Sequence, residues 1–100
     1  MNINITGFNF YKKLTALPFV EAIILYGSRA RGNFQKKSDI DLAIVCPQAS
    51  DKEWFAIRDI IDEADTLLKI DCVRFDKLPD DDSFKKEIIK DGQYLYKKEK

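Results

Sequence analysis

The sequence predicts a single small α/β domain that occupies residues 1–100. Segments with apolar residues at helical spacing alternate with short continuous apolar segments, which is typical of helices packed against buried strands. A chain of this length can bury one core but has no room for a separate substrate domain. No repeat, linker or low-complexity segment interrupts the pattern, so we expect one compact unit.

The first part of the chain is predicted to form a helix, a strand and a second, short helix. We expect residues 1–6 to be frayed or to form a short edge segment. A helix is predicted over about residues 7–17, because three apolar residues repeat at helical spacing: Phe10, Leu14 and Leu17. After Pro18, the apolar segment 19–26 predicts a buried strand, and Ser28 is then expected to act as the N-cap of a short helix.

The middle of the chain is predicted to hold a second strand and the longest helix. The strand covers residues 40–46 and is stopped by Pro47. Ser50 and Glu53 have the spacing of a capping box, which marks the start of a helix. That helix is expected to bury one apolar stripe, made of Trp54, Ile57, Ile61, Ala64 and Leu68.

The last third is predicted to contain a third strand over residues 70–75, a helix that ends at Gly92, and a short edge strand at 94–96. The acidic run 80–82 precedes this helix, and we interpret it as a capped, solvated turn rather than as an additional metal site. The residues expected to pack the helix are Phe84, Ile88 and Ile89.

Composition excludes several classes of function. The 17 basic and 17 acidic side chains cancel, so the chain has no global field that would attract duplex nucleic acid or an anionic membrane. The sequence has no histidine, which excludes Ser-His-Asp catalysis and His-ligated zinc and leaves carboxylates as the expected metal ligands. Cys46 and Cys72 lie in apolar segments, and we expect them to be buried and not disulfide-bonded.

The sequence favours a cytoplasmic location. No apolar segment approaches the roughly 20 residues needed to span a bilayer. The first residues also lack the basic and then apolar segments of a signal peptide. We therefore expect no membrane association.

Asp39 and Asp41 are the first candidate functional pair. Because they are two residues apart at the start of a predicted strand, both side chains leave the same face of the sheet. Two such carboxylates repel each other, and a divalent cation removes the repulsion; a pair of Mg²⁺ ions about 3.5–4 Å apart can share such ligands. Taken alone, the Asp-x-Asp pattern fits two exposed aspartates at a strand end better than a metal site.

The glycine turn before this pair changes that balance. Gly27 permits backbone conformations and close approaches that other residues resist, and Ser28 with the following amides suits a phosphate chain. Four basic residues and no acid lie between positions 27 and 37, namely Arg29, Arg31, Lys36 and Lys37. Either arginine can pair with phosphate oxygens. The pattern is neither a P-loop nor a dinucleotide fingerprint.

Asp71 is the candidate third carboxylate. It interrupts the otherwise apolar third strand, where a charge costs stability unless it is paired or functional. We expect it to bridge a second metal ion or to accept a proton from an attacking hydroxyl. Asp76 is the alternative, although its position is more typical of a turn at a strand end.

Three short segments together resemble the signature of the polymerase β nucleotidyltransferase superfamily: Gly27-Ser28, Ala30-Arg31-Gly32 and Ser38-Asp39-x-Asp41-Leu42. The short length and a downstream Asp71 are similar to its minimal nucleotidyltransferase branch. The resemblance implies a small mixed β-sheet with helices packed on one face. It also implies nucleotide binding by Gly27, Ser28, Arg31 and Ser38, and two Mg²⁺ ions held by three catalytic carboxylates, Asp39, Asp41 and Asp71.

The implied reaction is transfer of a nucleoside monophosphate from an NTP, with ATP as the expected substrate, to a hydroxyl, releasing pyrophosphate. Members of the minimal branch often pair with a small helical toxin of the HEPN type, and some adenylylate a tyrosine of it. Since this chain is too short to hold an acceptor pocket of its own, a partner or a second copy is expected to complete the site. The resemblance therefore implies an antitoxin that acts as a protein adenylyltransferase.

Two other interpretations remain open at this point. The chain can be a binding module that silences its partner sterically without catalysis, or a nucleotidyltransferase that modifies a small molecule or nucleic acid. The base preference, the acceptor, the oligomeric state and the choice between Arg29 and Arg31 are not determined by the sequence.

Overall fold

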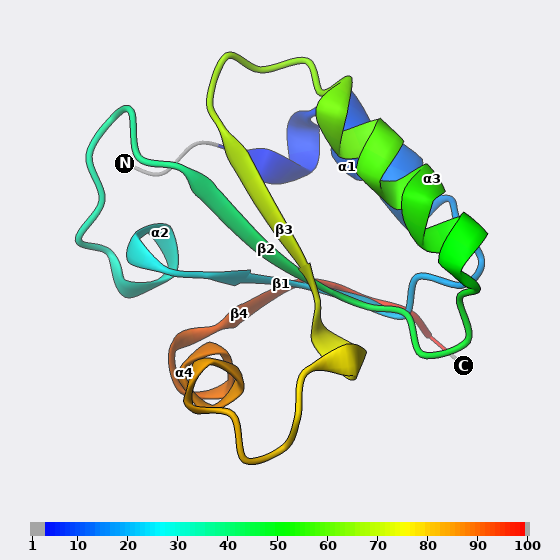
Figure 1. The fold of residues 1–100 in the computed structure, drawn as a ribbon. Helices are drawn as coiled ribbons and strands as arrows, with labels where there is room; N and C mark the ends of the chain where they lie inside the picture. The colour runs from blue at the N-terminus through cyan, green and yellow to red at the C-terminus, as the bar shows by residue number, and fades with distance from the viewer. Residues whose placement is uncertain (1–3, 100) are drawn as a thin grey trace.

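The structure, a computed structural model, describes residues 4–99 and has a four-stranded sheet at its centre (Figure 1). The helices and strands follow one another in the order η1 (Ile5–Gly7), α1 (Asn9–Thr15), β1 (Ala22–Tyr26), α2 (Ser28–Arg31), β2 (Ile40–Val45), α3 (Asp51–Asp62), β3 (Ile70–Arg74), η2 (Phe75–Lys77), α4 (Ser83–Asp91) and β4 (Gln93–Lys97). The predicted α/β class is confirmed. Over the described residues, no helix is long and apolar enough to cross a membrane.

The sheet is mixed, as the resemblance implied. Its strands lie in the order β3-β2-β1-β4, with β1 antiparallel to both of its neighbours and β2 parallel to β3. A parallel pair needs a crossover, and α3 supplies it between β2 and β3. The predicted edge strand near the C-terminus is therefore confirmed as β4, which leaves β3 and β4 at the two edges.

Helices α1 and α3 pack side by side on one face of the sheet and bury the main core (Figure 1). From β2 this face receives Ile40, Leu42 and Ile44, as the alternation predicted. The expectation of helices on one face holds for these two helices, whereas α4 packs on the opposite face against Ile24 and Ala43. Apolar residues occupy both faces of β1 and β2, so each face needs a cover.

The two ends of α3 differ in how well the sequence predicts them. The Ser50–Glu53 capping box is present, with both reciprocal hydrogen bonds formed. The helix ends at Asp62, so Ala64 and Leu68 pack against the core from the following loop rather than from the helix. In that loop, the carboxylate of Asp65 accepts hydrogen bonds from the amides of Asn9 and Phe10 and so caps α1, whose own N-cap residue has no capping side chain.

Two smaller expectations are corrected, and a third is confirmed. Ile5 is buried in η1 rather than frayed, while residues 1–3 lie outside the described part of the chain. Ile89 is 65% exposed, and α4 packs through Ile88 and Phe84 instead. The acidic run behaves as interpreted, since the Asp82 side chain accepts a hydrogen bond from the Phe84 amide and caps α4.

Both cysteines are buried and not disulfide-bonded, as expected. Burial raises the pKa of the Cys46 thiol to about 11 and that of Cys72 to about 12. Because the thiolate is the reactive form, neither side chain serves as a nucleophile near neutral pH.

The capping box gives a test of the fold. Replacing Ser50 with Ala removes the acceptor for the Glu53 amide and should lower the free energy of unfolding by about 1 kcal/mol in urea titrations. Ser83→Ala is the matched control, because Ser83 is exposed and follows the Asp82 cap, and it should change stability by less than about 0.5 kcal/mol. Equal losses in the two variants would contradict this role of Ser50.

Candidate active site

The register of the sheet places two of the candidate carboxylates and a tyrosine in one row. Tyr26 of β1 pairs with Asp41 of β2, and Asp41 pairs with Asp71 of β3. Directly paired residues project from the same face of a sheet. All three side chains therefore lie on the face that carries α4, where Tyr26 packs against the small apolar cluster of Ile24, Ala43 and Ile88. Asp39 precedes β2 by one residue and is exposed.

Asp41, in the middle of this row, interacts electrostatically with the other candidate carboxylates. Partial burial raises the pKa of its carboxyl group, and the negative charges of Asp71 and Asp39 raise it further, while Arg31 opposes the shift. The structure thus brings the three predicted carboxylates into one electrostatic neighbourhood. Burial, and then the negative charges of Asp41 and Asp71, raise the pKa of the Tyr26 phenol to about 12.

Gly27 meets the predicted need for a special backbone. Its φ of 74° lies in the left-handed region, where residues with a Cβ are strained. A Cβ at this position would overlap the Oδ2 atom of Asp41 and come within 3.1 Å of its Cγ. The turn is therefore packed directly against the central carboxylate, and only glycine leaves room for that contact.

The following turn corrects one detail of the sequence analysis. Gly27, not Ser28, occupies the N-cap position of α2, and its carbonyl accepts hydrogen bonds from the amides of Ala30 and Arg31. Ser28 is the first helical residue. Strand β4 also contacts this turn, because the Gln93 side chain donates a hydrogen bond to the Ala30 carbonyl over 2.8 Å.

Arg29 is buried and stabilises the fold. Its side chain is 3% exposed, and its guanidinium donates to the carbonyls of Ser38 and Lys36 at 2.9–3.1 Å. It also lies over the ring of Phe34, with 5.1 Å between Cζ and the ring centroid. Arg29 therefore holds the loop that leads into Asp39, which gives a basic residue in the turn a structural role.

Arg31 is exposed and stays the candidate phosphate ligand. Its side chain is 46% exposed, and it forms a long ion pair of 3.9 Å with Asp91 of α4. Its charge also acts on Asp41. Ser38, by contrast, uses its hydroxyl to accept a hydrogen bond from the Gln35 amide, so it closes the loop before Asp39.

Asp71 is oriented towards Lys69, with 3.6 Å between Nζ and Oδ1. Within residues 4–99, no group of three or more His, Cys, Asp or Glu side chains is arranged so that it could hold a metal ion as it stands. The donor set itself consists of carboxylate oxygens, which suit Mg²⁺.

The two other acidic candidates have structural partners. Asp76 accepts a hydrogen bond from the Cys46 amide and pairs with Arg74 at 3.0 Å, which fastens the end of β3 to the end of β2. Asp80 pairs with Lys85 at the surface. The interpretation of Asp76 as a strand-end residue is therefore confirmed.

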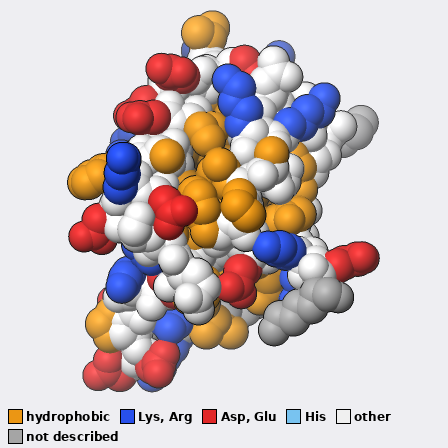
Figure 2. All heavy atoms as spheres, turned by 90° about the vertical axis from the view of Figure 1, so that its right-hand side faces the viewer, with side chains coloured by type: hydrophobic (Ala, Val, Ile, Leu, Met, Phe, Trp, Pro, Cys, Tyr) orange, Lys and Arg blue, Asp and Glu red, His pale blue; other side chains and the backbone are white. Residues whose placement is uncertain are grey.

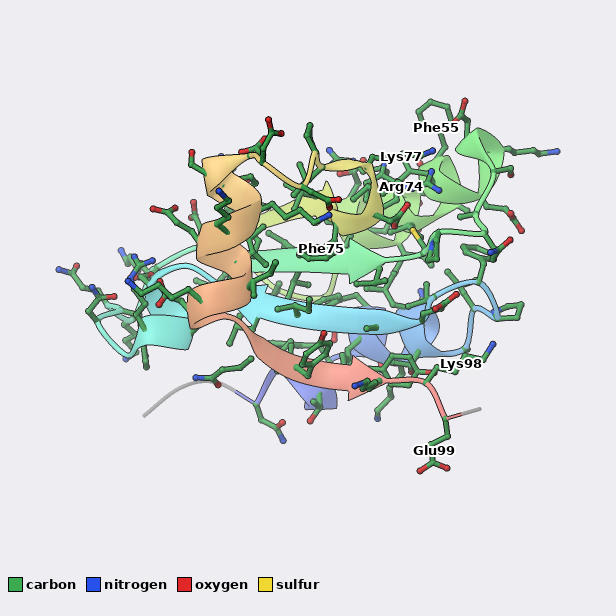
Figure 3. The ribbon with its side chains drawn as sticks, turned by 90° about the horizontal axis from the view of Figure 1, so that it is seen from below. Phe55, Arg74, Phe75, Lys77, Lys98 and Glu99 are labelled. Atoms are coloured by element: carbon green, nitrogen blue, oxygen red, sulfur yellow. The ribbon has the colours of Figure 1, made fainter. Side chains whose placement is uncertain are left out.

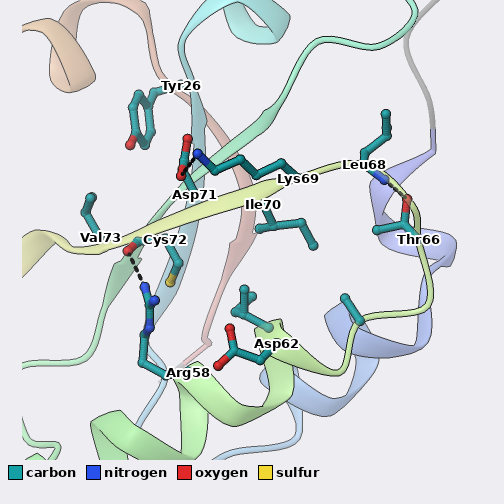
Figure 4. A pocket seen from close by; sticks show the side chains of 12 residues that line it. Tyr26, Arg58, Asp62, Thr66, Leu68, Lys69, Ile70, Asp71, Cys72 and Val73 are labelled. Atoms are coloured by element: carbon teal, nitrogen blue, oxygen red, sulfur yellow. Dashed lines mark hydrogen bonds and ion pairs between the residues drawn. The ribbon is translucent and has the colours of Figure 1, made fainter.

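A groove of about 570 Å³ runs along β3 beside the row of functional side chains (Figure 4). Tyr26 and Asp71 line one side of it, and residues from the end of α3 and the loop after it line the other. Arg58 of α3 reaches into this groove and donates to the Cys72 carbonyl over 3.2 Å. The sequence analysis did not single out Tyr26 or this groove, because both depend on which strands are neighbours.

A second cavity, of about 560 Å³, lies at the other end of β1 and β2. Ala22, Val45 and Phe75 form its apolar part, and Lys98 and Glu99 lie at its rim. Figure 3 shows Phe75 beside α4 and the two charged residues at the end of β4. Hydrophobic side chains also gather in the middle of the face drawn in Figure 2, with charged ones around them. This cavity is remote from Asp41.

Comparisons with known proteins identify the family and the fold. The model of a family described as polymerase beta nucleotidyltransferase matches residues 10–100. No curated protein matches the chain. Among solved structures, a toxin–antitoxin with AMP-PNP is similar at 20% identity and a TM-score of 0.65, over 90% of this chain and 73% of that one.

Two further solved structures are similar. One is a mutant of the toxin–antitoxin MntA-HpeT, with 22% identity and a TM-score of 0.62 over 90% of this chain and 72% of the other. The second is a putative nucleotidyltransferase from Sulfolobus solfataricus, with 21% identity and a TM-score of 0.58 over 91% of this chain and 77% of that one. At these identities the similarity concerns the fold.

The raised pKa of Asp41 predicts that its charged carboxylate lowers the stability of the fold at neutral pH. A carboxyl group whose pKa is higher in the folded than in the unfolded state stabilises the fold at low pH, and this contribution is lost as pH rises through the folded pKa. Asp41→Asn should therefore melt at a higher temperature than the wild type at pH 7, and the difference should shrink below the ordinary aspartate pKa of 3.8. Calorimetry at pH 7 and pH 3.5 measures this, and a lower melting temperature for the variant at pH 7 would contradict it.

Substitution of Arg29 should affect stability, whereas substitution of Arg31 should affect ATP binding. Arg29→Met leaves the Ser38 and Lys36 carbonyls without their donor and should cost about 2–3 kcal/mol of unfolding free energy. Arg31→Met should change stability by less than about 0.5 kcal/mol but weaken ATP binding about tenfold in calorimetric titrations. Unchanged ATP affinity in Arg31→Met would exclude Arg31 as a phosphate ligand.

Proposed function

Because the chain belongs to the polymerase β nucleotidyltransferase family, we propose that it transfers AMP from ATP to a hydroxyl group of a partner protein. The observation that carries this proposal is the contact between the Gly27 turn and Asp41, with Asp71 beside it in register. The turn suits a triphosphate, and the adjoining acids suit the metal ions that accompany it.

We assign the metal-binding role to Asp39, Asp41 and Asp71. Their oxygen atoms match the preference of Mg²⁺. Burial and then repulsion by Asp71 and Asp39 raise the pKa of Asp41, and a cation would relieve that repulsion. Two Mg²⁺ ions, when bound, would neutralise charge on the phosphates and activate the attacking oxygen.

The remaining residues bind and orient the nucleotide. Backbone amides of the Gly27–Ser28 turn and the guanidinium of Arg31 would hold the triphosphate, and Ser38 would support the loop that presents Asp39. The acceptor oxygen attacks the α-phosphorus, the bond to the bridging oxygen breaks, and pyrophosphate leaves. Asp71 is the carboxylate placed to take the acceptor's proton.

The partner is proposed from the similar structures. Two of them are described as toxin–antitoxin structures, one of them with AMP-PNP, and their folds match most of this chain. We infer that this protein acts as the antitoxin of a small helical toxin of the HEPN type in the cytoplasm. The partner would supply the hydroxyl acceptor and complete a site that this domain leaves open on one side.

The test uses the purified protein, ATP labelled on its α-phosphate, Mg²⁺ and the product of the adjacent gene. The wild type should transfer the label to that product, EDTA should abolish transfer, and Asp41→Asn should reduce it by more than about a hundredfold. Asp80→Asn is the matched control, because Asp80 is fully exposed and remote, and it should transfer at the wild-type rate.

Three other outcomes would count against the proposal. If the wild type and Asp41→Asn silence the partner equally and no label is transferred, the protein acts by steric binding. Label on a small molecule or a nucleic acid, but not on the protein partner, would assign a different acceptor. Transfer that resists EDTA would contradict the assignment of the metal ligands.

A further inference from the structure

The free edge of β3 has unpaired backbone groups that face the groove. β3 is the terminal strand of the sheet, and its inner edge pairs with β2, since the Ile40 amide donates to the Lys69 carbonyl over 2.9 Å. In a parallel pair, alternate residues turn their backbone groups towards the partner strand. With Asp41 opposite Asp71, the inward residues of β3 are 69, 71 and 73, so Ile70 and Cys72 turn their amide and carbonyl groups outward.

The groove wraps around this edge. It is lined by side chains from both faces of β3: Ile70 and Cys72 from the α3 face, and Asp71 and Val73 from the α4 face. A cavity lined from both faces of one strand lies at the level of the strand itself, where an added strand would lie. The groove has a volume of about 570 Å³, and the polar side chains that line it include Thr66 and Asp62.

Arg58 limits how far such pairing can extend. Its guanidinium already occupies the outward carbonyl of Cys72. The segment open to pairing therefore covers the first half of β3, from the Ile70 amide to the Cys72 amide. This is the part of the edge that adjoins Asp71, so a docked chain would be aligned with the site rather than with the remote end of the sheet.

We propose that the acceptor protein docks as an extended polypeptide segment that adds a fifth strand at the free edge of β3. Main-chain hydrogen bonds to Ile70 and Cys72 supply affinity without demanding a particular sequence. The inference rests on the proposed transferase function and specifies how its substrate is held.

The register explains why this docking would be productive. Tyr26, Asp41 and Asp71 form a row across three adjacent strands, so a residue opposite Asp71 on an added strand would carry its side chain into the same row. Facing side chains on neighbouring strands have Cβ atoms about 4.5–5.5 Å apart. A serine, threonine or tyrosine at that position would thus present its hydroxyl next to the carboxylate that takes its proton.

The first measurement is hydrogen exchange along β3, in the protein alone and with a saturating amount of the adjacent-gene product. The outward amides of Ile70 and Cys72 should exchange fast in the free protein and become protected in the complex. Asp71 and Val73 are the internal controls, because their amides already pair with β2 and should change little. Unprotected amides at 70 and 72 in a saturated complex would overturn the proposal, as would protection that appears in the concentrated protein alone and marks a second copy.

The second measurement uses a matched pair of variants on α3. Asp62 is exposed and lines the groove, whereas Asp59 is equally exposed on the same helix and does not. Asp62→Trp should fill the groove and raise KM for the partner about tenfold, with KM for ATP unchanged, and Asp59→Trp should leave both constants unchanged. Equal KM for the partner in the two variants would reject docking at this edge.

The two measurements separate the proposals. Transfer to the partner without protection of Ile70 and Cys72 would retain the transferase function and reject strand addition. Protection of these amides without transfer of label would reject the transferase function and retain the docking surface.

Discussion

The architecture of the site depends on one steric constraint, the absence of a side chain at Gly27. This gap lets the turn after β1 lie against the carboxylate of Asp41 on the adjacent strand. The positive φ of Gly27 also starts α2, so one residue controls both the direction of the chain and the distance between the turn and the acid. The remainder of the domain can be understood as support for this contact: the sheet fixes Asp41, and Arg29 fixes the loop that delivers it.

The local features of the fold followed from the sequence, because they depend on residues close together in the chain. The capping box at Ser50, the strand that contains Asp41, and the glycine in a left-handed conformation are of this kind. The expectation that Asp39 and Asp41 share a face follows from their spacing and stays a prediction, because Asp39 precedes β2. Asp71 was identified because a charge in an apolar strand requires an explanation.

Features that depend on which elements are neighbours in space could not be predicted from the sequence. Pairing of Tyr26 with Asp41 and of Asp41 with Asp71 requires the strand order, which the periodicity does not contain. The capping of α1 by Asp65 joins residues more than 50 positions apart, so local spacing in the sequence does not reveal it. Arg29 and Arg31 looked equivalent in sequence, and only the loop that folds over Arg29 distinguishes a buried anchor from an exposed cation.

The C-terminal strand β4 helps to hold the turn that follows β1. Through Gln93 it is fastened to Ala30, and through the neighbouring Asp91 it faces Arg31, so the last elements of the chain hold the turn that follows the first strand. A binding event or a cut that detached β4 would release the far side of α2 while leaving the acids on β2 and β3 paired. Loss of β4 would thereby loosen the turn that starts at Gly27, although no residue of β4 belongs to the row that surrounds Asp41.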